Sequence, residues 1–381
     1  MAMATAEMFS LGIVGLPNVG KSTLFNALAR ANANVANYPF TTIEPNKGIV
    51  DVPDDRLERV AALAEATKVT PETIEFVDIA GLVKGASRGE GLGNKFLSHV
   101  REVDAIVHVV RCFADDSVAH VDGSPDPVRD MGVIETELVL ADLETVGRRI
   151  KKVEPMLKTG DKKYAAELDA LRHIEQLLDA GTPLRRAELD GDIARLVSEM
   201  FLLTVKPVVI VANVSEQELE AAMLTASGLV APDRTLPAVL AVMQEAKGDQ
   251  VVPVSAKLEA QLCELTREEA DEYLAELGFS DSALTELIKA GRRALHLVTF
   301  YTIKGTETRA WTIPSGTVAP AAAGKIHSDM ERGFIKAEVI TCDELLSIGS
   351  FAMARERGRV HTEGKEYVIQ NGDVVLFKFN V

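Results

Sequence analysis

Short apolar runs alternate with helical segments along the first three hundred residues. Runs typical of buried strands cover residues 11–14, 74–79, 208–211 and 251–254. Helical periodicity follows the first run at 22–28 and returns at 267–297. Strands that are joined through helices pair in parallel, because the chain must cross back over the sheet between them. The pattern therefore predicts an α/β fold with a mostly parallel sheet.

A helical hairpin interrupts this alternation. Two stretches carry apolar residues at spacings of three and four, which is the seam of a coiled coil. Thr159–Asp161 separates the two stretches, and Gly181–Pro183 ends the second one. We expect an inserted helical arm over about 134–204. Its seam positions are Leu143, Val146, Ile150, Val153 and Leu157, then Leu168, Leu171, Ile174 and Leu178.

From residue 298 the pattern changes to short alternating strands and turns. Residues 298–303 form one predicted strand, and 374–379 form another after the turn Asn371–Asp373. About eighty residues with a central helix predict a small α+β module of the β-grasp type. The expected domains are therefore 9–297, which includes the arm, and 298–381.

A complete phosphate-binding motif lies between the first predicted strand and its helix. Gly15–Ser22 matches G-x-x-x-x-G-K-[ST]. Its glycines let successive backbone N–H groups point at one anion, and the following helix N-terminus favours phosphate. Lys21 is expected to reach the β- and γ-phosphates, and the Ser22 hydroxyl suits Mg²⁺. The residues expected to hold the nucleotide here are Gly15, Pro17, Asn18, Val19, Gly20, Lys21, Ser22 and Thr23.

Two further segments follow in the order that a nucleotide switch requires. The hydroxyl-rich loop 37–45 is placed to close over the γ-phosphate, and Thr42 is the candidate second Mg²⁺ ligand, with Thr41 as the alternative. The strand at 74–79 then runs into D-x-x-G. Asp78 would bind a water on the metal, and the Gly81 N–H would sense the γ-phosphate.

Several of these segments resemble the YchF-type Obg-like ATPases, a branch of the Obg-related TRAFAC-class P-loop NTPases. The residues that carry the resemblance are Gly15–Thr23, Asn37–Asn46, Phe76–Asn94, Arg309–Pro314 and Ala323–Asp329. It extends over about 9–381. It implies an ATPase that associates with the ribosome, with the large subunit as the expected contact. It also implies that the C-terminal module is a TGS domain, which would dock RNA or protein.

The base-reading motif departs from that of GTPases. They carry N-K-x-D, whereas this chain has Asn213, Val214, Ser215 and Glu216. The longer Glu216 carboxylate cannot occupy the position of Asp without a backbone shift, and losing the guanine contacts would cost GTP about 1–3 kcal/mol. Asn213 could still bond the base edge, beside Val214. Ser255 and Ala256, in a Ser-Ala-Lys motif after the last predicted strand, would brace the base. ATP is therefore the expected substrate, and a GTPase switch of the Obg class is the alternative.

The catalytic group is also unusual, because Leu82 occupies the position where many GTPases have a water-orienting Gln. Lys21 and Mg²⁺ would contribute to catalysis. In the resembled family a His on the loop 113–120 is a proposed catalytic residue, and His120 matches it; an ordinary surface His is the alternative. Asn18 is a further candidate, since Asn at this position in related NTPases helps hold K⁺. The alternative is that Asn18 only stabilises the loop.

Composition places the protein in the cytoplasm. The three cysteines have neither metal-ligand spacing nor a paired framework, so reduced thiols are expected. No apolar stretch is long enough to span a bilayer, and the first seven residues lack the features of a signal peptide. No membrane partner is expected, and a monomer is the favoured state.

Charge is distributed unevenly along the chain. The formal net charge is −16, which opposes RNA binding, yet residues 145–190 hold ten basic and eight acidic residues, and 298–381 hold ten of each. RNA or ribosome contacts are therefore expected on the arm and the C-terminal module. A ribosome- or RNA-binding module whose nucleotide site only tunes affinity is a further alternative. The basic candidates are Arg148, Arg149, Lys151, Lys152, Lys162 and Lys163 of the arm, and Lys325, Arg332 and Lys336 of the tail.

Overall fold

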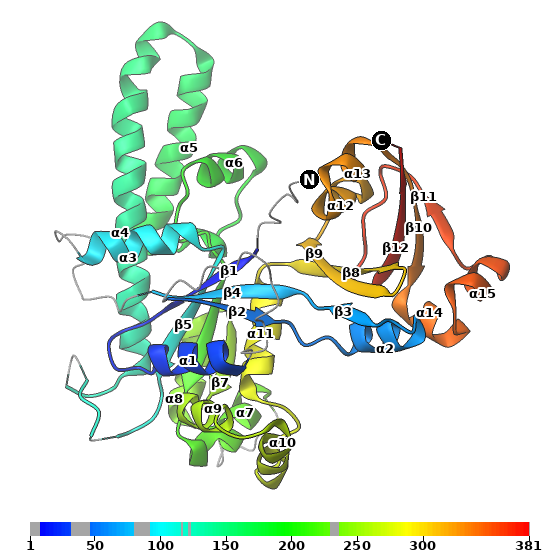
Figure 1. The fold of residues 1–381 in the computed structure, drawn as a ribbon. Coiled ribbons are helices and arrows are strands. Elements are labelled where there is room, and N and C mark those ends of the chain that lie inside the picture. The colour runs from blue at the N-terminus through cyan, green and yellow to red at the C-terminus, as the bar shows by residue number, and fades with distance from the viewer. Residues whose placement is uncertain are drawn as a thin grey trace. The chain divides into compact units, whose positions relative to one another are not determined.

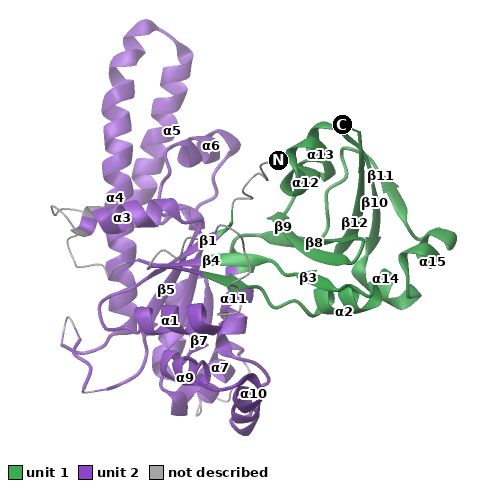
Figure 2. Cartoon of the chain, viewed as in Figure 1, with its two compact units in different colours: residues 1–9, 49–75, 292–381 green, residues 10–48, 76–291 purple. Residues whose placement is uncertain are grey.

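The computed structural model of the protein describes residues 8–31, 46–79, 92–115, 117–120, 123–228 and 236–380. The chain divides into two compact units, residues 10–48 with 76–291 and residues 1–9 with 49–75 and 292–381 (Figure 2). The segment 49–75, which the sequence analysis placed within the N-terminal domain, groups with the C-terminal residues.

The strands of the first sheet stand in the order β2-β4-β1-β5-β6-β7. Its central members β1, β5, β6 and β7 pair in parallel, so the parallel sheet predicted from the strand and helix alternation is confirmed. β5 and β6 are buried along their whole length, as expected of strands covered on both faces. The bounds are β1 Ser10–Val14, β2 Lys47–Asp51, β4 Thr73–Asp78, β5 Ala105–Arg111, β6 Val208–Asn213 and β7 Gln250–Val254.

Helices connect the strands of this sheet. The N-caps are the residues that sequence rules favour: Ser255 accepts from Leu258 N at the start of α9, and Thr266 forms a capping box with Glu269 at the start of α10. No described helix is long and apolar enough to cross a membrane. The bounds are α1 Lys21–Ala31, α3 Leu92–Glu102, α7 Leu219–Ala226, α8 Pro237–Ala246, α9 Ala256–Leu262, α10 Arg267–Glu276 and α11 Ala283–Ala294.

The predicted arm is confirmed as a hairpin of α4 (Pro127–Val153) and α5 (Lys162–Asp179), which lie side by side in Figure 1. The seam from Val146 to Leu178 is buried, but Leu157 is 40% exposed, so its assignment to the seam was wrong. The α-helix ends at Val153 because Pro155 has no N–H, and the chain tightens into the 3-10 helix η2, Glu154–Thr159. The chain returns through η3 (Leu184–Arg186) and α6 (Gly191–Glu199).

The smaller unit contains a mixed sheet in the order β11-β10-β12-β8-β9-β3. β12 lies parallel to β8, and β3, from the segment 49–75, lies parallel to β9 at the edge. Phe300, Phe334 and Phe377 form the aromatic part of its core. The bounds are β3 Lys68–Thr70, β8 Leu297–Lys304, β9 Glu307–Pro314, β10 Phe334–Thr341, β11 His361–Glu363 and β12 Asp373–Phe379; the helices are α2 Asp55–Leu63, α12 Ala319–Ile326, α13 Ser328–Arg332, α14 Cys342–Ile348 and α15 Phe351–Glu356.

Candidate nucleotide site

The phosphate loop leaves β1 at Val14 and enters α1 at Lys21. Its second glycine could not be another residue without rearrangement. Gly20 has a φ of +100°, and a Cβ atom there would lie 2.3 Å from Asn213 Nδ2. A Cβ on Gly15 would lie 2.5 Å from the carbonyl oxygen of Val109 on β5. The two glycines therefore let the loop pack directly against its neighbours and curve its backbone around one point.

Lys21 lies inside this loop rather than in solvent. Its side chain is buried, with the residue 8% exposed, and Nζ donates to the carbonyl oxygen of Leu16 at 2.7 Å. Burial lowers the pKa of this ammonium, and the carboxylate of Asp78 partly opposes the shift. A desolvated cation held at the mouth of a phosphate loop would strongly attract a phosphoryl oxygen.

Ser22 and Asp78 meet beside the loop. Ser22 Oγ donates to Asp78 Oδ2 at 3.1 Å, which joins the start of α1 to the end of β4. A hydroxyl and a carboxylate oxygen at this spacing fit a Mg²⁺ ion, which takes oxygen ligands and shares its sphere with water and phosphate. The other expected residues of this region, Thr42 with its alternative Thr41, and Gly81 with the neighbouring Leu82, lie outside the described residues.

Asn213 connects the phosphate loop to the loop that follows β7. Its Nδ2 donates to Val19 O at 2.8 Å, and its Oδ1 accepts from Ala256 N at 3.1 Å. The residue is only 4% exposed. Both ends of this amide therefore bond the protein. Its expected contact with the base stays a prediction.

The two substituted positions of the base-reading motif are occupied by other contacts. Val214 is buried and packs among apolar residues below β6 and β7. Glu216 Oε1 accepts from the Tyr273 hydroxyl of α10 at 2.9 Å. Ser255 is fully buried and caps α9, and Ala256 is the first residue of that helix. A carboxylate that binds a tyrosine hydroxyl is directed toward α10 by that bond.

The loop after β5 is held by a buried arginine that sequence analysis did not single out. Arg111, 1% exposed, donates to the carbonyl oxygens of Phe113, Asp115 and Val118 at 2.9–3.3 Å. Its guanidinium also stacks on the Phe113 ring at 4.7 Å. The available signal was an arginine that ends an otherwise apolar strand, where a buried charge needs several acceptors. Arg111 gives this loop a defined shape.

His120 lies at the far end of the same loop, and its imidazole is buried. The side chain is 1% exposed, so the alternative of an ordinary surface histidine is wrong. Its Nε2 lies 2.8 Å from Oδ2 of Asp130, in the first turns of α4. Asn18 of the phosphate loop donates from Nδ2 to the carbonyl oxygen of Ala119 at 3.1 Å. The structure thus brings Asn18 and the His120 loop together, as two of the expected site residues.

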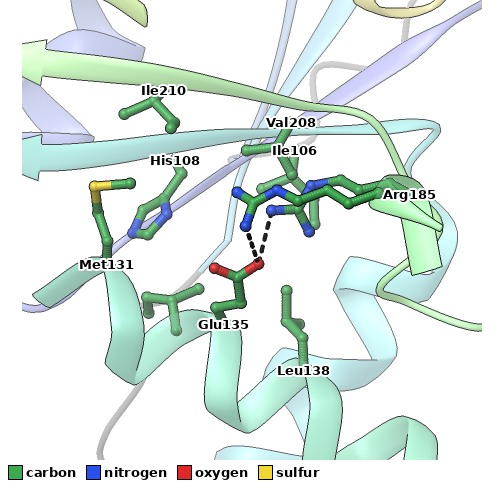
Figure 3. A pocket seen from close by; sticks show the side chains of 10 residues that line it. Ile106, His108, Met131, Glu135, Leu138, Arg185, Val208 and Ile210 are labelled. Atoms are coloured by element: carbon green, nitrogen blue, oxygen red, sulfur yellow. Dashed lines mark hydrogen bonds and ion pairs between the residues drawn. The ribbon is translucent and has the colours of Figure 1, made fainter. Parts of the chain in front are cut away.

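A small pocket lies between β5 and the base of the arm (Figure 3). Arg185 and Arg186 both bond Glu135 of α4 and also Asp249, which precedes β7. His108 of β5 lines the same pocket, where burial and the nearby cations lower its pKa to about 3. This ion-pair network fixes the arm to the sheet.

Comparison with known proteins places this geometry in a family. A family model described as 50S ribosome-binding GTPase matches residues 10–140, and a YchF-GTPase C-terminal model, described as a protein of unknown function, matches 297–380. The protein is 50% identical over 372 residues to a Bacillus subtilis protein named ribosome-binding ATPase YchF, covering 97% of this chain and 99% of that one. It is 47% identical over 374 residues to the protein of the same name from Escherichia coli O157:H7, covering 98% and 99%.

A solved structure gives the same answer. The structure of the Schizosaccharomyces pombe YchF GTPase has a TM-score of 0.86 and 35% sequence identity, and the match covers 99% of this chain and 100% of that one. Identity at this level over almost the whole length shows common descent of both units, not of the phosphate loop alone. The chain therefore belongs to the YchF family.

Proposed function

We propose that this protein binds and hydrolyses ATP with Mg²⁺ and associates with the ribosome. The observation that carries the proposal is the complete phosphate loop, in which Lys21 is buried at the loop and Ser22 bonds Asp78. Relatives that match nearly the whole chain are named ribosome-binding ATPases.

Three residues would hold the metal in this proposal: Ser22, Asp78 through a water, and Thr42. A bound Mg²⁺ would neutralise charge that develops on the transferred phosphoryl group. Lys21 would stabilise the same charge, and the Gly81 N–H would bond the γ-phosphate. His120 would orient the attacking water, in place of the Gln for which Leu82 stands. Asn18, whose amide nitrogen already bonds Ala119, could hold K⁺ through its oxygen.

The preference for adenine follows from the contacts of the base-reading motif. Val214 is buried in the core, and the Glu216 carboxylate accepts from Tyr273. Neither side chain offers the Lys and Asp contacts that guanine requires. We expect ATP to bind at least about tenfold more tightly than GTP, which corresponds to about 1.4 kcal/mol. The Schizosaccharomyces pombe relative is called a GTPase, so titration of this protein with both nucleotides decides the question, and equal or tighter GTP binding would refute the preference.

Hydrolysis is tested by removing the two groups nearest the phosphates. Lys21→Ala and Ser22→Ala should each abolish ATP hydrolysis, because one removes the cation and the other a metal ligand. Lys95→Ala, at an exposed lysine of α3, is the matched control and should keep the normal rate. Hydrolysis at the normal rate by both site variants would contradict the proposal.

The arm is the proposed ribosome contact. Arg148 pairs with Glu144 and Arg149 with Glu167, so part of the basic set is neutralised within the hairpin. The lysines nearer the tip are exposed and have no acidic partner among the described residues; they are Lys151, Lys152, Lys162 and Lys163. Lysines of this kind would bind phosphate and release counterions.

Charge reversal tests this surface. Changing the four tip lysines to Glu should weaken co-sedimentation with ribosomes, and raised salt should have the same effect on the unchanged protein. ATP hydrolysis by the free protein should persist, because the phosphate loop is unaltered. The control is Lys95→Glu in the sheet unit. Binding that ignores both salt and the reversals would place the contact elsewhere, with Lys325, Arg332 and Lys336 of the tail as the next residues to test.

A further inference from the structure

The buried pair of His120 and Asp130 has a defined chemistry. An ionised carboxylate only accepts hydrogen bonds, so the Nε2 atom that lies 2.8 Å from Asp130 Oδ2 carries the proton. The neutral imidazole then has its lone pair on Nδ1. A carboxylate that fixes one tautomer of a histidine in this way leaves the opposite nitrogen able to accept a proton or a water hydrogen.

The carboxylate itself is held in place. Arg129 donates to Asp130 Oδ1 from Nη2 at 3.1 Å and from Nε at 3.3 Å, and the same guanidinium bonds the carbonyl oxygen of Ser124. Asp130 is 2% exposed. One oxygen of the carboxylate thus binds an arginine and the other binds the imidazole, so the buried charge is compensated and the imidazole has a single direction of approach.

The histidine is also tied to the phosphate loop. Asn18 donates to the carbonyl oxygen of Ala119, the residue directly before His120, and Arg111 fixes the preceding loop through three carbonyl oxygens. The His120 ring is therefore attached to α4 on one side, and its backbone is attached to the phosphate loop on the other. Phosphates that fill the loop would act on the Asn18 bond first.

We propose that Asp130 is a positioning residue for ATP hydrolysis, which holds His120 in the Nε2–H tautomer so that Nδ1 faces the attacking water. This inference rests on the proposed catalytic role of His120. No bond changes at Asp130. In the hydrolytic step the imidazole orients the water, and Asp130 compensates any positive charge that develops on the ring.

The substitution Asp130→Asn provides the test. Asn retains the shape of Asp, but its amide nitrogen can donate to Nε2 and so favour the opposite tautomer. We expect kcat for ATP to fall at least tenfold with KM unchanged, and His120→Ala to lower kcat by about a hundredfold, within the usual range for a positioned acid or base. Asp126→Asn removes the same charge from the exposed N-cap of the same helix, where Asn also caps, and should leave kcat unchanged.

A double variant separates positioning from a purely structural role. If Asp130 acts through His120, then Asp130→Asn should have no further effect on kcat in the His120→Ala background. A structural role would lower kcat by the same factor in both backgrounds, and that result would overturn the inference. A normal kcat for Asp130→Asn with a low kcat for His120→Ala would overturn this inference alone. A normal kcat for His120→Ala would overturn the catalytic role of His120 as well.

Discussion

Replacement of Asn213 by Ala should weaken the binding of every nucleoside triphosphate by a similar factor. The Asn213 amide donates to Val19 O at 2.8 Å and accepts from Ala256 N at 3.1 Å. Removing it leaves one buried carbonyl and one buried N–H without their partner, and each such loss costs about 1–3 kcal/mol. We therefore expect the free energy of unfolding to fall by about 2–5 kcal/mol.

The comparison of two nucleotides separates bracing from base reading. A brace supports the phosphate loop, so its loss should reduce ATP and GTP affinity together. A base contact would lower ATP affinity while leaving that of GTP almost unchanged. Asn213→Asp is a useful second variant, because it keeps the acceptor for Ala256 N but sets a carboxylate oxygen against the Val19 carbonyl. It should be at least as damaging as Ala.

The assays are calorimetric titration with each nucleotide and denaturant unfolding. Unfolding should be followed by far-ultraviolet circular dichroism, since the single tryptophan, Trp311, belongs to the other unit. A changed ratio of ATP to GTP affinity with normal stability would refute the bracing role and establish Asn213 as a base reader.

Two further changes have outcomes set by local geometry. Gly20→Ala places a Cβ 2.3 Å from Asn213 Nδ2 and should lower ATP affinity at least about tenfold in a titration, whereas Gly123→Ala, with φ +87° but open space around it, should leave ATP affinity unchanged. His108 is neutral when folded because burial lowers its pKa to about 3. The unfolded state therefore binds the extra proton below pH 6.5, so stability falls as the pH is lowered. His108→Gln should remove about 2 kcal/mol of the loss between pH 6.5 and 4.5 in denaturant unfolding, and an unchanged pH dependence would contradict the assignment.

The parts of the fold that could be predicted are those written in local periodicity. The strands at 11–14, 208–211 and 251–254 and both arm helices follow from spacing alone. The central strand β5 was not assigned, because His108 and Arg111 interrupt its apolar run although both are buried. The grouping of 49–75 with 292–381 also escaped prediction, since β3 is three residues long and pairs with a strand more than two hundred residues away.

The site divides in the same way. The phosphate loop is contiguous, so its motif carries both its shape and its chemistry. The Ser22–Asp78 contact could be anticipated from motif order. The contacts of Asn213 with Val19, of Glu216 with Tyr273 and of His120 with Asp130 could not, because each depends on how distant loops pack after folding. For polar residues, the type and approximate role were readable, but the partner was not.

Three attachments meet on the loop after β5: Asn18 from the phosphate loop, Arg111 from the sheet, and Asp130 from the arm. Any energetic link between nucleotide and ribosome requires a physical connection between their sites, and this loop supplies one within a single unit. Linkage then sets a quantitative condition. If ATP changes the affinity of the protein for ribosomes by some factor, ribosomes must change its affinity for ATP by the same factor. Substitution of Asp130 should alter both factors equally, because a shared connection cannot be weakened in one direction only.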